Sequence, residues 1–147
     1  MKLSEHFHLD EFVTSQTAAR HGIDNRPPPA VLTRLRILAA HLERARVILG
    51  GKPLLISSGY RSPPLNARIG GSKTSAHLRG DAADFICPGY GGPLAVCRAI
   101  AESDLAFDQL IEEGTWVHLG FAAEGRKARR QVMTKRPGGG YVTGLAA

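Results

Sequence analysis

The sequence lacks long apolar runs. None of its 147 residues lies in a stretch of about 18 consecutive apolar residues, the length that a membrane-spanning helix needs. The N-terminal segment MKLSEHFHLDEF also lacks the apolar core of a secretory signal peptide. We therefore expect a protein without a transmembrane segment and without its own export signal, located in the cytoplasm.

Cysteine is scarce as well. Cys87 and Cys97 are the only two, and they flank a turn rich in proline and glycine. Two cysteines argue against the disulfide framework of a small secreted domain, so we expect reduced thiols in the core. The apolar fraction of 43% is ordinary for a chain that buries a core. The length fits one domain, and we expect a single domain over residues 1–147 that is monomeric.

Acidic residues are fewer than basic ones, which gives a formal net charge of +6. A positive surface favours acidic partners in general. Much of the excess lies in residues 125–136, GRKARRQVMTKR, where no aromatic side chain is interleaved to stack on bases. We interpret this segment as a solvated, charged edge hairpin and expect no specific nucleic-acid partner.

Apolar periodicity and turn residues predict a mixture of helices and strands. Apolar residues recur at steps of three or four through residues 30–49, as one buried helix face requires, and Gly50 and Gly51 follow. Other segments predict short helices at 9–22 with Ser15 as N-cap, a buried strand at 53–59, a partly helical loop at 60–75, a strand at 80–87, a helix at 93–103, a hairpin at 107–121 and an edge strand in the tail.

The glycine-rich stretch GGSKTSAHLRGDAADF, residues 70–85, invites comparison with a phosphate-binding loop. That motif, G-x-x-x-x-G-K-[ST], requires glycine where this chain has Ala67 and Ser72. Without those glycines the backbone amides do not readily surround a phosphate. The stretch instead offers His77 and Asp84, seven residues apart.

The predicted hairpin determines which acidic side chain can meet a histidine. If residues 114–115 form its turn, cross-strand pairing places Glu113 and His118 on one face and Glu112 on the other. A carboxylate and an imidazole on one face are what a metal-dependent hydrolase needs beside its ligands. On this argument we prefer Glu113 over Glu112.

His77, Asp84 and His118 would together supply two imidazole nitrogens and one carboxylate oxygen. These donors suit zinc and leave a fourth tetrahedral position for water. An open position indicates catalysis, because zinc lowers the pKa of bound water toward about 7 and a nearby glutamate can take the proton.

The motif S-x-H-x-x-G-x-A-x-D at residues 75–84, followed by Trp-Val-His at 116–118, resembles the M15 family of zinc peptidases that act on peptidoglycan. That family includes D-alanyl-D-alanine carboxypeptidases and phage endolysins. The segments LSEHFHLDEF at 3–12 and SSGYRSPPLN at 57–66 also resemble its compact single-domain branch. The resemblance implies an α+β, hedgehog-type fold in which a small antiparallel sheet carries the metal and helices pack on one side.

The resemblance also implies roles for single residues. Arg61 matches the arginine that binds the substrate carboxylate or stabilises the oxyanion, and Ser75 matches the serine near the bound peptide. Many relatives carry the acidic base where this chain has Thr115. The compact branch places a glutamate shortly before the tryptophan, which fits Glu113. The zinc ligands of the family match His77, Asp84 and His118.

Other polar residues near the motif have open interpretations. Ser75 also suits capping of local backbone, Trp116 suits a place in the core, and Gln109 suits either orienting a ligand or supporting the sheet. Asp81 is out of phase with Asp84 and is expected either behind the ligands or on the surface. Four histidines are assigned no metal role: His6, His8, His21 and His41.

The function implied is a zinc-dependent metallopeptidase that hydrolyses peptidoglycan peptides by metal-activated water, as a carboxypeptidase or as an endolysin-type endopeptidase. Without an export signal, a phage lysis enzyme that waits in the cytoplasm fits this reading. The alternative is a non-catalytic, zinc-containing binding module on the same fold, since a fold does not fix function.

Overall fold

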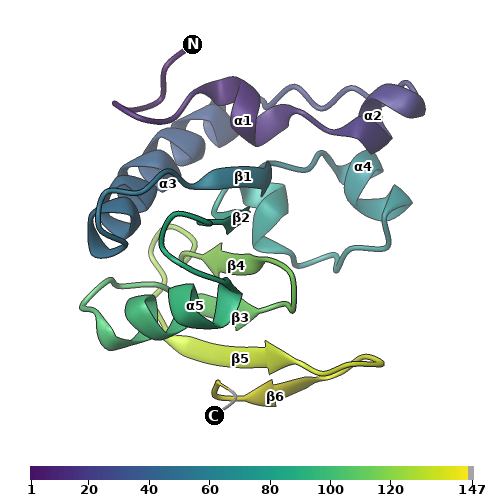
Figure 1. Ribbon diagram of the computed structural model, residues 1–147. Helices are drawn as coiled ribbons and strands as arrows, with labels where there is room; N and C mark the ends of the chain where they lie inside the picture. The colour runs from purple at the N-terminus through teal and green to yellow at the C-terminus, as the bar shows by residue number, and fades with distance from the viewer. Residues whose placement is uncertain (146–147) are drawn as a thin grey trace.

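The structure is a computed structural model that describes residues 1–145. It is organised around one six-stranded mixed sheet, against which the helices pack (Figure 1). The elements are α1 (Leu9–Val13), α2 (Gln16–Arg20), α3 (Pro29–Ile48), β1 (Leu55–Ser58), α4 (Pro63–Arg68), the 3-10 helix η1 (Ala76–Arg79), β2 (Ala82–Ile86), α5 (Pro93–Glu102), β3 (Gln109–Glu112), β4 (Val117–Gly120), β5 (Gln131–Lys135) and β6 (Tyr141–Thr143). The strand order is β1-β2-β4-β3-β5-β6, and only β3 and β5 pair in parallel. The predicted α+β class with a mainly antiparallel sheet is confirmed.

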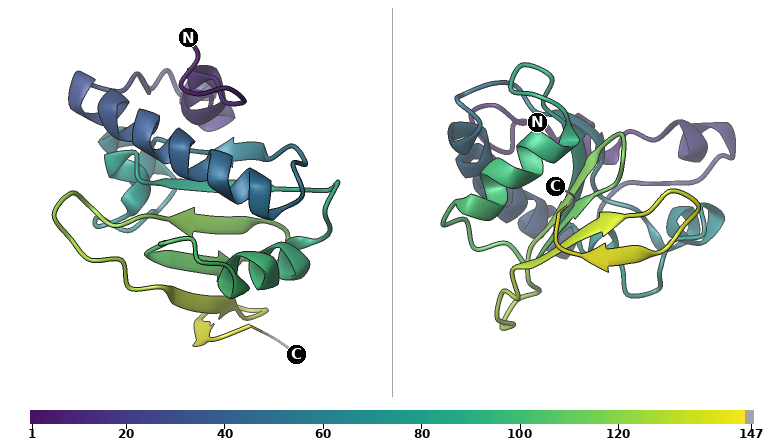
Figure 2. Two further views of the ribbon diagram at one scale, coloured as in Figure 1. Left: turned by 90° about the vertical axis from the view of Figure 1, so that its left-hand side faces the viewer. Right: turned by 60° about the horizontal axis from the view of Figure 1, so that its bottom comes forward.

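The two longest helices, α3 and α5, cover one face of the sheet (Figure 2). The predicted face of α3 is buried at Leu35, Leu38 and Leu42, while Val31 in its first turn is half-buried. Gly50 and Gly51 follow the helix with φ of 73° and 75°, a left-handed conformation that ends a helix and that favours glycine. The core therefore lies between these helices and the sheet.

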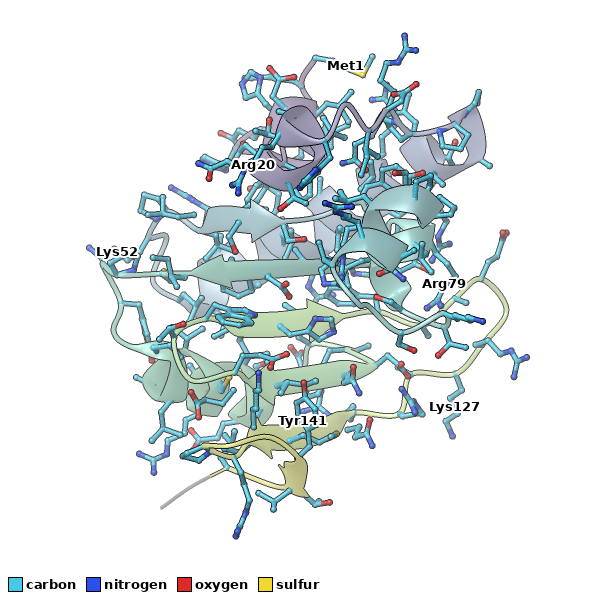
Figure 3. The ribbon with its side chains drawn as sticks, turned by 90° about the vertical axis from the view of Figure 1, so that its right-hand side faces the viewer. Met1, Arg20, Lys52, Arg79, Lys127 and Tyr141 are labelled. Atoms are coloured by element: carbon cyan, nitrogen blue, oxygen red, sulfur yellow. The ribbon has the colours of Figure 1, made fainter. Side chains whose placement is uncertain are left out.

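The opposite face of the sheet is left open by α3 and α5 and carries many polar side chains (Figure 3). Side chains alternate along a strand, so Ala83 and Phe85 of β2 enter the core while Asp84 points away from it. The short elements α4 and η1 lie on this open side (Figures 1 and 3). The helices α3 and α5 thus cover one face of the sheet, as expected, and the short helices α4 and η1 lie on the opposite face.

Strand β1 is not the buried strand that was predicted. Leu55 is 51% exposed, and no residue between Leu55 and Ser58 is fully buried. The reason is position, because β1 is an edge strand that pairs within the sheet only with β2. An apolar run indicates a strand, but it does not show which neighbours that strand acquires.

The basic segment 125–136 is not a single edge hairpin either. Residues 125–130 form a connection, and the strand that follows them, β5, lies between β3 and β6. Arg129 in this connection forms an ion pair with Asp108, with Nη2 2.8 Å from Oδ2. The edge strand expected in the tail is β6, which pairs with β5 across a glycine-rich turn.

Two further expectations concern the thiols and the membrane. Cys87 and Cys97 are both buried and free, as predicted. Burial, with a contribution from Glu112, raises the pKa of the Cys97 thiol to about 12, so it stays protonated at neutral pH. No helix within residues 1–145 is both long and apolar enough to cross a membrane.

Asp81 is buried, so the surface interpretation of this residue is wrong. It is 3% exposed, and its carboxylate pairs with Nε of Arg34 at 2.7 Å and with Nε of Arg79 at 3.0 Å. Arg34 belongs to α3, and its Nη2 also donates to the carbonyl of Ala122. The pair therefore ties α3 to the segments that flank β2 and β4.

We predict that Asp81→Asn lowers the free energy of unfolding by about 1–3 kcal/mol, because it leaves the guanidinium of Arg34 without a buried counter-charge. Urea unfolding followed by circular dichroism measures this. Asp24→Asn is the matched control, since Asp24 pairs with Arg26 on the exposed surface and should leave the unfolding midpoint unchanged. Equal midpoints for the two variants would show that the buried pair contributes nothing.

Candidate metal centre

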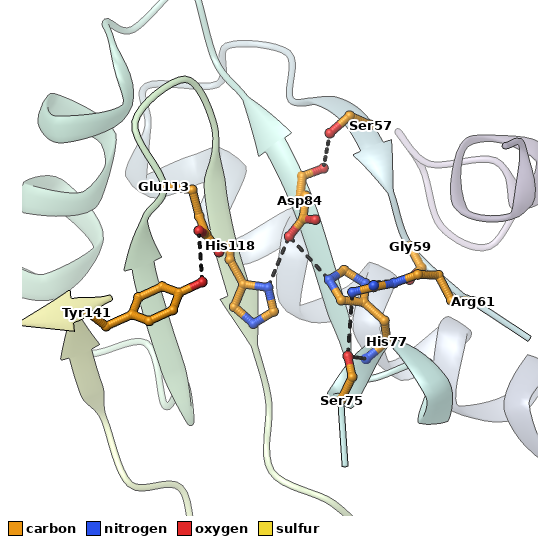
Figure 4. Close-up of polar contacts among 9 residues, drawn as sticks. All are labelled: Ser57, Gly59, Arg61, Ser75, His77, Asp84, Glu113, His118 and Tyr141. Atoms are coloured by element: carbon orange, nitrogen blue, oxygen red, sulfur yellow. Dashed lines mark hydrogen bonds and ion pairs between the residues drawn. The ribbon is translucent and has the colours of Figure 1, made fainter. Parts of the chain in front are cut away.

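The pairing of β2 with β4 creates the core of the candidate site. Asp84 and His118 are direct cross-strand partners, and directly opposed residues of an antiparallel pair project from the same face. The helix η1 brings His77 to the same place, at the open face of the sheet (Figure 4). The three predicted ligands offer donor atoms that all lie within 4.8 Å of one another.

One carboxylate oxygen joins the two imidazoles. Oδ1 of Asp84 lies 3.2 Å from Nε2 of His77 and 3.0 Å from Nδ1 of His118. The two rings meet edge to face, with their centroids 5.1 Å apart. His77 is 1% exposed and His118 is 9% exposed, so the group is shielded from bulk water on most sides.

The hydrogen bond on the far side of His77 indicates a cation between these donors. Nδ1 of His77 lies 2.6 Å from the carbonyl oxygen of Gly59, which only accepts, so Nδ1 carries the proton. In the neutral ring Nε2 then presents a lone pair to Oδ1 of Asp84, and two acceptors at 3.2 Å repel unless a cation lies between them. A backbone carbonyl behind a histidine is also the usual support of a metal ligand.

The protonation states agree with metal binding. Burial lowers the pKa of His77, and the neighbouring charge of Asp84 offsets this only in part, so the ring is neutral at neutral pH. Burial alone would raise the pKa of Asp84, but the hydrogen bond from His118 and the adjacent imidazole of His77 hold it well below its usual range. A neutral imidazole and an ionised carboxylate are the forms that coordinate a metal.

The local sequence explains how η1 positions His77. The hydroxyl of Ser75 accepts a hydrogen bond from the backbone N–H of His77 at 3.2 Å and so caps η1. Gly80 ends η1 with φ of 76°, and an added Cβ there would lie 3.0 Å from Val31 of α3. The motif S-x-H-x-x-G thus combines a cap with a stop, and the capping role considered for Ser75 is present.

Arg61 extends from the connection between β1 and α4 toward the predicted ligands (Figure 4). Its backbone N–H donates to the carbonyl of His77 at 3.1 Å, and its Nη2 donates to the hydroxyl of Ser75 at 3.5 Å. Its Nε is buried and has no hydrogen-bond partner within residues 1–145. Burial lowers the pKa of Arg61, and the charge of Asp84 opposes this, so a cation with spare donors faces the site.

The β3–β4 hairpin has the predicted register, and its two glutamates separate as expected. Ile111 opposes His118, and the N–H of Glu113 donates to the carbonyl of Trp116 at 3.0 Å. Glu113 faces the predicted ligands (Figure 4), and burial raises its pKa despite the opposing influence of His118. Glu112 lies on the other face, where its charge acts on Cys97 of α5.

These residues surround a hollow of about 840 Å³, called the cleft below. Trp116 is half-buried and lines the cleft rather than filling the core. Gln109 also lines it, but its Nε2 is engaged by Oε1 of Gln131 at 2.9 Å, which is the supporting role considered for it. Besides the three predicted ligands, the wall includes Arg61, Ser75, Glu113, Trp116, Lys135 and Tyr141.

Sequence reasoning missed three contributors to the site, one behind His77 and two in the cleft wall. Gly59 orients His77 through its carbonyl oxygen, which no side-chain pattern reveals. Lys135 and Tyr141 reach the cleft because β5 pairs with β3 and β6 pairs with β5. Their only sequence signal was a strand-like tail, which does not say where the strands attach.

The histidines that were given no metal role lie apart from the group within residues 1–145. The ring of His41 stacks on Phe121, with centroids 4.3 Å apart and planes 10° apart. Nδ1 of His6 contacts Oε1 of Glu43 at 2.6 Å. Both histidines have structural contacts that account for them.

Fold and site together define a protein whose mixed sheet carries, on its open face, two histidines and one carboxylate that could hold a metal ion. Residues 5–120, more than half of the chain, match the family described as Peptidase M15, and the chain belongs to this family. It is also similar to the zinc D-Ala-D-Ala carboxypeptidase of Streptomyces albus G, with 32% identity over 73 residues. That match covers 50% of this chain and 28% of the relative, so the chain spans less than a third of the relative's length.

The donor set fits the predicted zinc, and we expect the purified chain to bind a single zinc ion. His118→Gln should weaken zinc binding by at least about 100-fold, because it removes one of three donors that converge on the same point. Zinc titration by calorimetry measures the affinity, and elemental analysis measures the stoichiometry. His21→Gln, which changes an exposed histidine outside the group, is the control. Equal affinities in the two variants would exclude this centre.

Proposed function

We propose that the chain is a zinc-dependent metallopeptidase that hydrolyses peptide bonds of bacterial peptidoglycan. The observation that supports this most directly is the convergence of His77, Asp84, His118 and Glu113 on one cleft. Membership of the Peptidase M15 family and the similarity to a zinc D-Ala-D-Ala carboxypeptidase point to the same chemistry. A non-catalytic binding module that merely contains zinc would have no need of the additional acidic side chain of Glu113 beside the group.

His77, Asp84 and His118 would hold the zinc ion. When bound there, zinc supplies Lewis acidity, which acidifies a water molecule and polarises the carbonyl of the scissile amide. The carbonyl of Gly59 keeps His77 in the tautomer whose Nε2 is free to coordinate. Burial of both imidazoles strengthens the electrostatic interactions inside the site by limiting screening from water.

Glu113 is the carboxylate in the cleft best suited to accept a proton. Two other carboxylates line the cleft. Asp84 faces both imidazoles, and Asp108 is paired with Arg129. No salt bridge engages Glu113 in the described part of the chain. Burial raises the pKa of Glu113 toward neutral pH, which favours both the uptake and the later release of a proton.

We assign two successive roles to Glu113. Its carboxylate takes a proton from the attacking water, whose oxygen forms the new bond to the carbonyl carbon. It then delivers that proton to the nitrogen of the scissile amide as the carbon–nitrogen bond breaks, so the products are a carboxylic acid and an amine. No covalent bond to the protein forms in this scheme.

Arg61 is suited to bind an anionic oxygen of the substrate or of the transition state. Its guanidinium stays charged, offers donors in a planar fork and has an unpartnered Nε. Its contact with Ser75 and its backbone bond to His77 fix its position relative to the predicted ligands. An oxyanion beside the guanidinium would gain stabilisation only as charge develops.

Digestion of purified peptidoglycan tests the proposed function. We expect the zinc-loaded chain to release muropeptide fragments whose masses identify a hydrolysed peptide bond, and removal of zinc by a chelator to stop their release. Liquid chromatography with mass spectrometry reports both the activity and the bond that is cut. It also distinguishes trimming of a terminal residue, as in a carboxypeptidase, from internal cleavage of the endolysin type. Unchanged muropeptides after digestion with the zinc-loaded chain would exclude the peptidase and leave a binding module.

A pair of neighbouring variants tests the base. Glu113→Gln should keep zinc affinity and lower kcat by about 100- to 10,000-fold, because it removes the proton acceptor while preserving shape. Glu112→Gln makes the same change on the opposite face of the hairpin and should retain most of the activity. The two kcat values are compared on the muropeptide that the unaltered chain cleaves. A larger loss in Glu112→Gln would move the base role to that residue.

A further inference from the structure

The β5–β6 hairpin contributes to the cleft although it lies outside residues 5–120, the part of the chain that matches the family. Both Lys135 of β5 and Tyr141 of β6 line the cleft. The proposed zinc ligands and base all lie within the matched residues and do not account for either side chain. The position of Lys135 and Tyr141 in the cleft wall therefore suggests a role that is specific to this chain.

Strand pairing explains why these two side chains face the cleft. Gln131 is the parallel partner of Gln109, and the bond between their side chains shows that they share a face. By alternation, Lys135 projects from the same face as Gln131. Tyr141 is the direct cross-strand partner of Lys135, and its hydroxyl donates to Oε1 of Glu113 at 3.4 Å. The hairpin thus presents an ammonium and a phenol beside Glu113.

The four cations of the cleft wall differ in their pairing. Arg79 is paired with Asp81, and Arg129 is paired with Asp108. Within residues 1–145, Lys135 and Arg61 make no ion pair within 4.0 Å. The ammonium of Lys135 lies 6.0 Å from the centre of the Trp116 ring, at the edge of the range for a cation–π contact. Its donors remain available to a ligand.

These two cations approach the site from opposite sides. Arg61 and Tyr141 lie on either side of His77, Asp84 and His118 (Figure 4), and Lys135 is paired with Tyr141 across the hairpin. A peptide that crosses the predicted metal group would therefore meet a positive charge at each end. Peptides with acidic groups on both sides of the scissile bond would match this charge pattern.

We propose that Lys135, supported by Tyr141, forms a subsite for a substrate carboxylate distinct from the one that faces Arg61. The preferred substrate is then a peptide with a free carboxylate on each side of the bond that is cut. This specificity rests on the proposed peptidase function, because it describes the substrate of the same cleft.

Two peptides that differ in one functional group test the subsite. The probe is an acetylated stem peptide of γ-linked D-glutamate, L-lysine and two D-alanines, made with the α-carboxylate of its glutamate either free or amidated. We expect the unaltered chain to prefer the free carboxylate by about 5- to 10-fold in kcat/KM, the gain expected for one charge-assisted contact in a partly exposed cleft. The preference should appear in KM and should shrink as ionic strength rises.

Substitutions of Lys135 assign that preference to its ammonium. Lys135→Gln should abolish the ratio of kcat/KM between the free and the amidated peptide, chiefly by raising KM for the free carboxylate, while Lys135→Arg should retain the ratio. Arg136→Gln is the matched control, because it removes the same charge at the next position, which does not line the cleft. A preference that survives in Lys135→Gln, or that falls equally in Arg136→Gln, would overturn the subsite.

Binding measurements separate this inference from the proposed activity. Calorimetry compares the affinities of the two peptides without turnover. It uses zinc-loaded Glu113→Gln and the double variant that carries both Glu113→Gln and Lys135→Gln. Selective binding of the free carboxylate that depends on Lys135 would support the subsite even if muropeptides were not cleaved. Equal affinities for both peptides would reject the subsite, and an active enzyme with equal affinities would leave the peptidase function intact.

Discussion

The register between β2 and β4 is the constraint on which the site depends. Asp84 and His118 meet because they are cross-strand partners, and a slip of one residue would turn one of them toward the core. The core itself prevents this slip, since Ala83, Phe85 and Leu119 alternate with them and are fully buried. The hydrophobic packing beneath α3 and α5 therefore fixes the polar geometry on the opposite face of the sheet.

His77 is held by a different kind of constraint, because it comes from a short 3-10 helix rather than from a strand. Its position depends on backbone contacts: the carbonyl of Gly59 at Nδ1, the N–H of Arg61 at its own carbonyl, and the cap from Ser75. The buried carboxylate of Asp81 ties the end of η1 to α3 through Arg79 and Arg34. A side chain on a short 3-10 helix is thus as well fixed as one on a strand, because its backbone is bonded on both sides.

The sequence allowed prediction of what depends on local pattern. The buried face of α3, the hairpin register and the convergence of His77, Asp84 and His118 all followed from periodicity or from the family motif, and the structure contains them. The exposure of β1 and the parallel pairing of β5 with β3 depend on which distant strands become neighbours. Local periodicity has no information about that choice, so Lys135 and Tyr141 could not be placed in the cleft in advance.

The geometry of the β3–β4 hairpin supports Glu113 as the proposed base. Thr115, the other position that the family resemblance suggested for an acid, is an exposed turn residue and does not line the cleft. Two residues earlier, the strand-like pairing of Glu113 with Trp116 aims its side chain at the face that holds His118. Glu113 in this paired region keeps a carboxylate beside the predicted ligands. It also places that carboxylate within reach of Tyr141, which couples the proposed base to the hairpin that completes the cleft.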